Sequence, residues 1–333
     1  MLQSKLWLPP DSGVKHLPVN KKYFGGCMKK SFFLFILFCA VQLFAETAPW
    51  DGDSFDWQSV PEQYPGIRHT SLSTTVPRHN KINIVRIDLH TPNLKFAVTP
   101  RGDHYGETMP DAPKFKIATR RERTSDFMLG HRKAGRNMVL AANTAPWAPW
   151  CPPWTHTYAA CMGLLISDGV QVDCINKKNY RPVFYQTKDG KYGMKIFTPG
   201  EDYSHLQQAV SGFYFNLEAG NVVERPDRLM PCCSFGLDKS CRYLYIIIID
   251  GRQKQFSEGA TSKETGKYLK KLGAYNGIYM DGGGSATLTV WDPDHKFKGF
   301  KNPHESGTHT LNHQPKAYER LVGCNVGFFF DGK

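Results

Sequence analysis

The ten residues from Tyr279 to Leu288 read Tyr-Met-Asp-Gly-Gly-Gly-Ser-Ala-Thr-Leu. The apolar run before them, Gly277 to Met280, is typical of a buried strand, so we expect the strand to end by presenting Asp281 and three glycines. These glycines tolerate positive φ angles and let a ligand approach the backbone N–H groups, and Ser285 adds a hydroxyl donor. A carboxylate beside such donors suits sugar or phosphate chemistry.

The same stretch has a purely structural interpretation. Three glycines after a strand form a tight hairpin in many proteins, and an aspartate at a strand end often caps a turn. The stretch lacks the lysine of a Walker A loop and the Gly-x-Gly-x-x-Gly spacing of a dinucleotide-binding fold. The pattern therefore excludes these two nucleotide sites but leaves turn and active site open.

The N-terminal segment predicts export. Met28-Lys29-Lys30 precedes the apolar run 31–45, as in a secretory signal peptide, and this run is short of the roughly 20 residues that span a membrane. We therefore predict a signal peptide with an upstream extension over residues 1–45, a lead-in segment over 46–80 and one domain over 81–333. The mature protein is expected to be secreted or periplasmic, with no membrane span.

Charge and cysteine content limit the function classes. The chain has 333 residues and a formal net charge of +12. It shows no long Lys/Arg run or nucleic-acid-binding signature, so we expect no nucleic-acid partner. An odd number of cysteines follows residue 45, and proximity alone suggests pairing Cys151 with Cys161, and Cys232 or Cys233 with Cys241.

Hairpin signals dominate the rest of the chain. Lys81 to His90 alternates apolar and polar residues, and Leu94 to Thr99 is expected to return beside it. Asp-Gly turns at residues 168–169 and 189–190 predict two hairpins, and 208–217 with 220–223 predicts a third. Helices are expected over 124–133 and from the capping box at Thr261 to Leu272. These elements predict an α+β fold: a largely antiparallel or mixed β-sheet core with a few packed helices.

An aromatic, proline-rich loop follows the strand predicted at 138–142. Its indoles, Trp147, Trp150 and Trp154, could stack on a sugar ring. The alternative is that they only pack against the domain. A second polar segment contains His309 and His313, but helix propensity is poor there, so we interpret them as solvated loop histidines and predict no metal site.

With these segments in order, the sequence resembles the phosphodiester glycosidase family over roughly residues 138–330. The strongest similarity is Ile247-Ile-Ile-Asp-Gly-Arg252, followed by the helix 261–272 and the strand that leads to Asp281. The strand ending at Asn143 is similar to an Asn-Gly-Gly-Phe-Phe segment of the family, without its glycines. Residues 320–325 are similar to its closing Arg-x-Val-x-Asn motif. Where the family often has Pro-Arg-Thr, this chain has Pro231-Cys-Cys, which puts substrate handling in question.

The resemblance implies a secreted hydrolase that cleaves a sugar-1-phosphodiester, of the N-acetylglucosamine-1-phosphodiester kind, at the glycosidic linkage. Such a reaction passes through an oxocarbenium-like state, and two carboxylates usually share the work. We therefore assign Asp281 as base or charge stabiliser, with Asp250 or Glu264 as its partner. The residues expected to bind the substrate are Asn143, Trp147, Arg252, Gly282, Gly283, Gly284, Ser285 and Arg320.

Two rival functions stay open. The first is a non-catalytic carbohydrate or cell-wall binding protein on the same fold, which the aromatic loop and the Cys232 substitution favour. The second is a metal-dependent phosphoesterase, for which a convincing cluster of ligands is lacking. No cofactor is expected to be required, although a divalent cation held by Asp250 or Asp281 is possible.

Overall fold

The computed structural model describes residues 54–152, 155–173, 180–198, 200–225, 228–297, 299, 302–303, 307–315 and 318–331. All of them fall within one compact unit, residues 45–333. The predicted signal peptide lies outside the described residues. Within the described part of the chain, no helix is both long and apolar enough to cross a bilayer.

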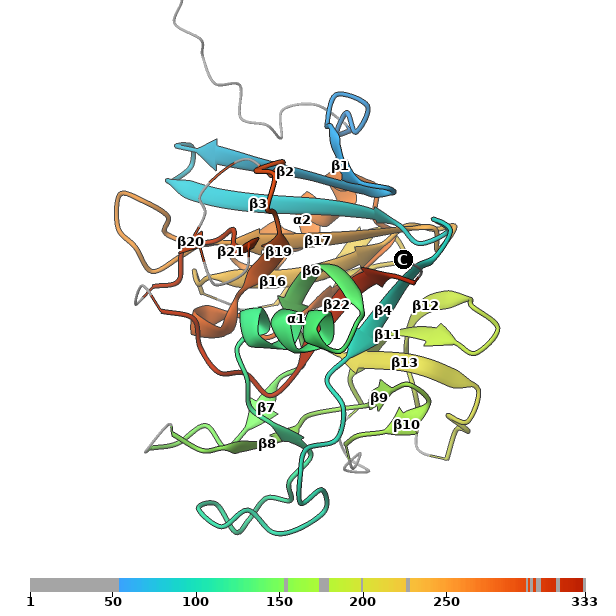
Figure 1. Cartoon of the computed structure of the whole chain (residues 1–333). Coiled ribbons are helices and arrows are strands. Elements are labelled where there is room, and N and C mark those ends of the chain that lie inside the picture. Colours follow the sequence, from blue (N-terminus) through green and yellow to red (C-terminus); the bar gives the residue numbers. More distant parts are fainter. Residues whose placement is uncertain are drawn as a thin grey trace, which may run out of the picture. The chain divides into compact units, whose positions relative to one another are not determined.

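The largest sheet has eight strands and is shown in Figure 1. From one edge to the other its strands are β1 (Glu62–Tyr64), β2 (Ile67–Thr74), β3 (Asn80–Asp88), β17 (Tyr243–Ile249), β16 (Cys232–Leu237), β18 (Asn276–Tyr279), β14 (Tyr214–Glu218) and β15 (Asn221–Val222). The central strand β17 is buried along Leu244 to Ile249, in agreement with its run of isoleucines.

Three smaller sheets complete the fold. The six-stranded sheet contains, in order, β20 (Asn302–Pro303), β21 (Thr308–Thr310), β19 (Leu288–Trp291), β6 (Asn137–Asn143), β22 (Asn325–Phe330) and β4 (Leu94–Val98). The five-stranded sheet contains β10 (Val170–Gln171), β9 (Leu165–Ser167), β13 (Leu206–Ser211), β11 (Pro182–Thr187) and β12 (Tyr192–Ile196). The three-stranded sheet contains β5 (Thr119–Arg120), β8 (Tyr158–Cys161) and β7 (Trp147–Ala148).

Two α-helices and one 3₁₀ turn are described: α1 (Thr124–Lys133), α2 (Ser262–Leu272) and η1 (Gly283–Ser285). Helix α2 begins with the predicted capping box, in which Thr261 accepts from the Glu264 N–H and the Glu264 carboxylate accepts from the Thr261 N–H. It ends at Gly273, whose φ of 108° is left-handed. Helix α1 has no side-chain cap, and the buried Glu319 accepts from the Ser125 N–H instead.

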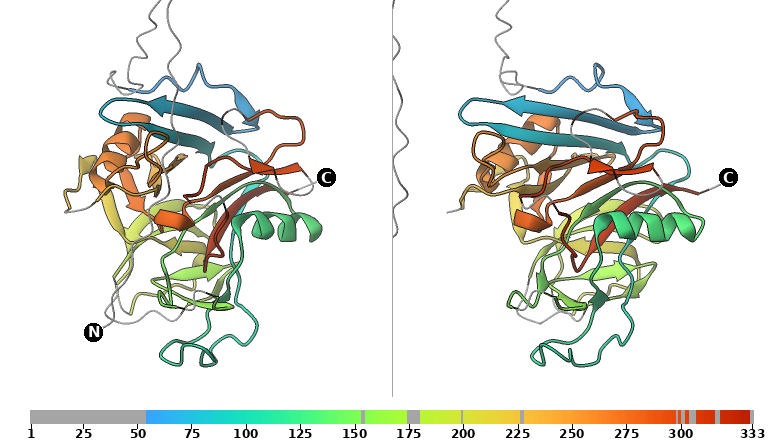
Figure 2. Two further views of the ribbon diagram at one scale, coloured as in Figure 1. Left: turned by 90° about the vertical axis from the view of Figure 1, so that its left-hand side faces the viewer. Right: turned by 60° about the vertical axis from the view of Figure 1, so that its left-hand side comes forward.

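The helices cover opposite faces of the packed sheets (Figure 2). The main core lies between the eight-stranded sheet and the six- and five-stranded sheets, and includes Ile246, Phe235, Leu140, Phe328 and Phe184. On the far face of the eight-stranded sheet, α2 packs through Leu269 and Leu272. On the far face of the six-stranded sheet, α1 packs through Phe127 and Met128.

The predicted α+β class is wrong, because the fold is mostly β with only two α-helices described. Every pairing between the named strands is antiparallel. Turn signals recur so closely along the chain that most segments are too short for helices, which explains the strand-rich result. Few segments carry the caps and spacing of a helix.

Strands β1 and β2 lie within the segment 46–80, which we expected to be a lead-in. Two local predictions were wrong. Strand β4 pairs with β22 in another sheet rather than with β3. The predicted strand 208–217 is two strands, β13 and β14, in different sheets. Each error concerns which strands become neighbours, and this depends on contacts far apart in the sequence.

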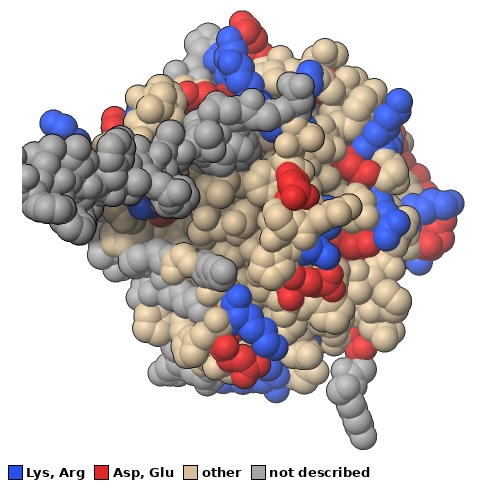
Figure 3. Space-filling model, turned by 90° about the horizontal axis from the view of Figure 1, so that it is seen from above, with Lys and Arg blue, Asp and Glu red and all other residues tan. Residues whose placement is uncertain are grey.

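The charged side chains are mixed on the face that Figure 3 shows. Lys and Arg side chains lie among Asp and Glu side chains there. On this face, therefore, the positive charge of the chain is not gathered into a patch of one sign.

Candidate active site

The backbone around Asp281 is held firmly in place. Asp281 follows β18 by one residue, and its N–H donates to the Thr144 carbonyl oxygen at 2.8 Å. Asn143 Nδ2 donates to the Asp281 carbonyl oxygen at 2.6 Å, and Asn143 Oδ1 accepts from the Thr287 N–H at 2.9 Å. The end of β6 therefore fixes both the aspartate and the chain that leaves the glycine turn. This gives buried Asn143 a positioning role.

The glycine turn needs the absence of side chains. Gly283 has a φ of 62°, in the left-handed region. A Cβ on Gly282 would lie 2.7 Å from the Pro231 carbonyl oxygen, and a Cβ on Gly284 would lie 2.5 Å from Arg320 Nη2. The glycines thus let a backbone carbonyl and a guanidinium approach the turn closely.

The Asp281 carboxyl is buried, at 4% exposure, and titrates near neutrality. Burial raises its pKa to about 7, against the opposing effects of the Ser285 hydroxyl, the Arg320 charge, the Trp147 indole N–H and the Gly282 N–H. Among the described residues, no donor reaches hydrogen-bonding geometry with Oδ2. A buried carboxyl with one unoccupied oxygen and a pKa near 7 is suited to proton transfer or charge stabilisation.

Three arginines, Arg228, Arg252 and Arg320, surround the turn. Burial lowers the pKa of Arg252, and the positive charges of Arg228 and Arg320 lower it further. Arg320 Nη1 donates to Ser285 Oγ at 3.4 Å. Within the described part of the chain, none of the three forms a salt bridge with an acid. Clustered cations without an anionic partner form a binding site for an anion.

Aromatic side chains form the rest of the wall. Tyr214 and Tyr279 stack with their ring centroids 5.4 Å apart, and Trp150 stacks on Trp147 at 5.0 Å. The Arg320 guanidinium lies 5.1 Å from the Trp150 ring centroid. Together with Phe213, Met230, the arginines and the glycine turn, these rings enclose a cavity of about 340 Å³ that contains Asp281. Aromatic faces beside a carboxylate suit a sugar ring.

A second cavity adjoins the first. It has a volume of about 220 Å³ and is lined by Gln314, Pro315 and Tyr318 on its outer side. Arg252, Gly284 and Arg320 line both cavities. The two arginines therefore stand at the boundary between the cavity of Asp281 and the cavity of Tyr318.

Comparison with protein families matches residues 152–329 to the phosphodiester glycosidase family. The match spans more than half of the chain. The chain belongs to the phosphodiester glycosidase family. A comparison with curated protein sequences gave no match.

A solved structure shares the fold of this chain. The catalytic domain of zebrafish N-acetylglucosamine-1-phosphodiester alpha-N-acetylglucosaminidase, auto-inhibited by its pro-peptide, matches with a TM-score of 0.52 and 18% identity, covering 83% of this chain and 86% of that one. A hypothetical protein from Synechocystis matches at 0.49 and 9% identity, covering 80% and 62%. A Burkholderia pseudomallei protein matches at 0.49 and 12% identity, covering 75% and 74%.

The structure does not bring the two predicted partner carboxylates to Asp281. Asp250 ends β17, which is separated from β18 by β16, and it faces a different cavity beside Lys81 and Phe256. Both of its carboxylate oxygens accept from the His313 N–H, at 3.0 and 3.1 Å. Glu264 is occupied by Arg78, at 2.9 and 3.0 Å, and by the capping box of α2. Among the described residues that line the cavity, Asp281 is the sole acid.

The predicted substrate-binding residues divide into two groups. Arg252, Arg320 and the three glycines line the cavity, as expected of a binding site. Trp147 is 1% exposed beneath Trp150 and lies under the Arg121 guanidinium, at 4.3 Å, so it cannot stack on a ligand. Trp150 takes the exposed position in this aromatic loop.

Sequence reasoning missed Arg228, Phe213, Tyr214 and Tyr279. These residues come from three separate segments, and although Tyr279 opens the stretch Tyr279 to Leu288, no pattern in the sequence marks its ring as part of a cavity wall. Cys232, the departure from the family pattern, is buried, and its Sγ contacts the Met230 and Ala260 carbonyl oxygens, each at 3.1 Å. Arg228, Arg252 and Arg320 supply positive charge to the cavity without an arginine at that position.

The cysteine and histidine predictions also need correction. Cys151, Cys161 and Cys241 are free thiols, so both guessed disulfides are wrong. His309 lies on β21 and is buried rather than solvated. In the part of the chain that the structure describes, no group of three or more His, Cys, Asp or Glu side chains could hold a metal ion.

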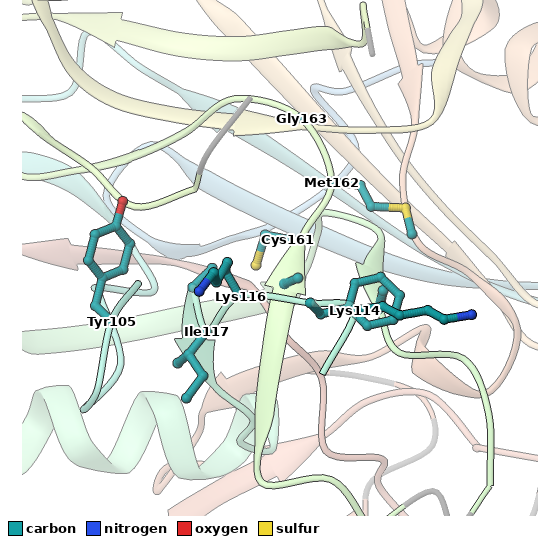
Figure 4. A pocket seen from close by; sticks show the side chains of 11 residues that line it. Tyr105, Lys114, Lys116, Ile117, Cys161, Met162 and Gly163 are labelled. Carbon is teal, nitrogen blue, oxygen red and sulfur yellow. The ribbon is translucent and has the colours of Figure 1, made fainter. Parts of the chain in front are cut away.

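Another cavity, of about 370 Å³, is shown in Figure 4. It is lined by Tyr105, Lys116, Ile117, Cys161 and Met162, among others. Among the described residues that line it there is no carboxylate, and none of them also lines the cavity of Asp281. The Asp281 cavity is therefore the candidate active site.

Proposed function

We propose that this protein hydrolyses a glycosyl phosphodiester of the N-acetylglucosamine-1-phosphodiester kind, at the bond between the anomeric carbon and the phosphate oxygen. The observation that carries the proposal is the Asp281 carboxyl, one oxygen of which has no donor among the described residues, opposite three arginines that form no salt bridge with a described acid. Membership of a glycosidase family supports the reaction class. The name of the zebrafish protein of similar fold supports the choice of substrate.

The two adjoining cavities suggest how such a substrate lies. The sugar occupies the cavity with Asp281, Trp150 and the tyrosines, since aromatic faces bind sugar rings and the carboxyl would then lie near the anomeric carbon. The phosphate lies at Arg252 and Arg320, on the boundary. The group on the far side of the phosphate extends towards Tyr318. The order of the three binding regions thus follows the order of the three parts of the substrate.

A single carboxylate is sufficient for this reaction. Ordinary glycosides need a second carboxyl to protonate the leaving oxygen, but the leaving group here is a phosphate monoester, whose oxygen is already a weak base. In our proposal the arginines stabilise the leaving phosphate by charge, as an oxyanion site does. The ionised Asp281 stabilises the oxocarbenium-like state or accepts the proton of the attacking water. Ser285, between Arg320 and Asp281, orients the carboxyl.

We propose further that the protein is exported, on the basis of the predicted signal peptide, and that the chain's own residues suffice without a cofactor. The alternative is a divalent cation at Asp281, and a chelator distinguishes this alternative from our proposal. If a cation takes part, a chelator abolishes sugar release and added Mg²⁺ or Ca²⁺ restores it. If the arginines suffice, the rate is unchanged by chelator.

The test is to incubate the full chain with N-acetylglucosamine-α-1-phosphodiesters and to follow free sugar. Release by the wild type, lost in Asp281→Asn, supports the proposal. Binding of the substrate without release from any member of the series would contradict it and favour the carbohydrate-binding alternative. A normal far-ultraviolet circular dichroism spectrum of the variant excludes misfolding.

A further inference from the structure

Outside the catalytic machinery, three side chains form a chain of polar contacts. His156 Nδ1 lies 2.6 Å from Asp111 Oδ2, and His156 Nε2 lies 3.9 Å from Cys151 Sγ. His156 is buried at 1% exposure, whereas Cys151 is exposed to solvent. An accessible thiol beside an imidazole that a carboxylate orients is the arrangement of an activated nucleophile.

The imidazole has a further polar neighbour. His156 Nε2 also lies 3.2 Å from the Cys151 carbonyl oxygen. Both ring nitrogens thus face oxygen atoms, which hold the ring in place beside Sγ. Arg121 is a cation at this site: its Nη1 donates to the His156 carbonyl oxygen at 2.8 Å, and its charge interacts with Asp111. The thiolate is the reactive form of a cysteine.

The thiol adjoins the active site through the chain. Cys151 follows Trp150, which lines the cavity of Asp281 and lies over the Arg320 guanidinium. A group attached to Cys151 would crowd Trp150 at the wall of this cavity. A modification there would therefore reach the substrate site, while modification of buried Cys161 could not.

We propose that Cys151 undergoes thiol–disulfide exchange with a small disulfide and that the attached group restricts access to the Asp281 cavity. In the exchange, the Cys151 thiolate attacks one sulfur of the disulfide. The S–S bond breaks, a new bond forms to Sγ, and the second sulfur leaves as a thiolate with the electron pair. The small disulfide is thus the only oxidant that the step needs, and an added thiol reverses it.

The exchange is tested on the full chain with dithiobisnitrobenzoate, an aromatic disulfide whose thiolate product is coloured, at about pH 6, well below the usual pKa of cysteine. We expect a fast phase that Cys151→Ser removes and that His156→Gln or Asp111→Asn slows about tenfold. The matched control is Cys241→Ser, a partly exposed thiol that leaves the fast phase unchanged. Equal rates for Cys151 and Cys241 would overturn the proposal.

Asp111→Asn also keeps the test valid if the buried His156→Gln variant fails to fold, because the Asp111 side chain is 42% exposed. An unchanged rate in folded Asp111→Asn would overturn the assigned role of the carboxylate.

Access to the cavity is measured by phenylglyoxal labelling of Arg252 and Arg320, mapped by mass spectrometry. We expect modified Cys151 to lower this labelling and dithiothreitol to restore it, whether or not the protein turns over a substrate. Unchanged labelling would overturn the restriction of access.

Discussion

Two aspartates follow the ends of β17 and β18, and their surroundings differ. Both Asp250 and Asp281 are buried, and burial raises the pKa of each to about 7. Both oxygens of Asp250 accept from the His313 N–H, whereas one oxygen of Asp281 has no donor among the described residues and the side chain faces an arginine-lined cavity. A perturbed pKa alone therefore does not mark an active site. What distinguishes Asp281 is the oxygen that no described residue reaches, together with a cluster of arginines in place of the single Lys81 that lines the cavity of Asp250.

The largest difference should appear in catalysis. Asp281→Asn removes the carboxylate that we assign to the reaction, so we expect kcat to fall by at least about a thousandfold. Asp250→Asn keeps an acceptor for the His313 N–H and should retain kcat within about threefold. Steady-state release of sugar from the phosphodiester measures both. Loss of activity in an Asp250→Asn variant with a native fold would contradict the assignment of the reaction to Asp281 rather than to Asp250.

Substitution of the cavity arginines should have the second largest effect on activity. Arg320→Gln or Arg252→Gln removes one of the charges opposite the phosphate, and we expect kcat/KM to fall by about a hundredfold. Arg242→Gln is the matched control, since Arg242 pairs with Asp88 at the surface. If the control loses as much kcat/KM as the cavity variants, then the net charge of the protein, rather than the charge at the cavity, governs substrate binding. Competition by inorganic phosphate should weaken only in the cavity variants.

Stability provides a different contrast. Because the folded pKa of Asp250 is raised, the folded protein holds a proton that the unfolded chain releases above about pH 4, so this residue lowers stability as pH rises to about 7. Asp250→Asn should remove this fall of the free energy of unfolding with pH. Above pH 7 the variant should then gain on the order of 1 to 4 kcal/mol relative to the wild type. Urea unfolding of both proteins between pH 5 and about pH 8 measures it. A pH-independent difference between them would contradict the assignment.

Glu264→Gln should have the smallest effect. It weakens the capping box and the pair with Arg78, so we expect a loss of about 1 kcal/mol in the free energy of unfolding with kcat unchanged. Thermal unfolding and sugar release measured on the same sample separate the two quantities. A large fall in kcat with an unchanged free energy of unfolding would show that Glu264 takes part in catalysis.

Much of the local structure was predictable from the sequence. The capping box at Thr261, the Asp-Gly hairpins and the end of β18 at Asp281 all depend on neighbouring residues, so their patterns were visible. The pairing of strands was not, since β4 and β22 are more than two hundred residues apart. For the same reason Arg228 and the Tyr214 ring were missed. Glu264 was assigned to catalysis although its own motif, the capping box, already explained it.

The most direct test of the role of Asp281 is the pH dependence of kcat/KM, measured for the wild type, Asp250→Asn and Arg320→Gln. Because the ionised Asp281 is the active form, we expect activity to rise with pH through about 7 in the wild type and in Asp250→Asn. Arg320 lowers the pKa of Asp281, so the rise should move to higher pH in Arg320→Gln. A rise that disappears in Asp250→Asn and stays in place in Arg320→Gln would contradict the assignment of the reaction to Asp281.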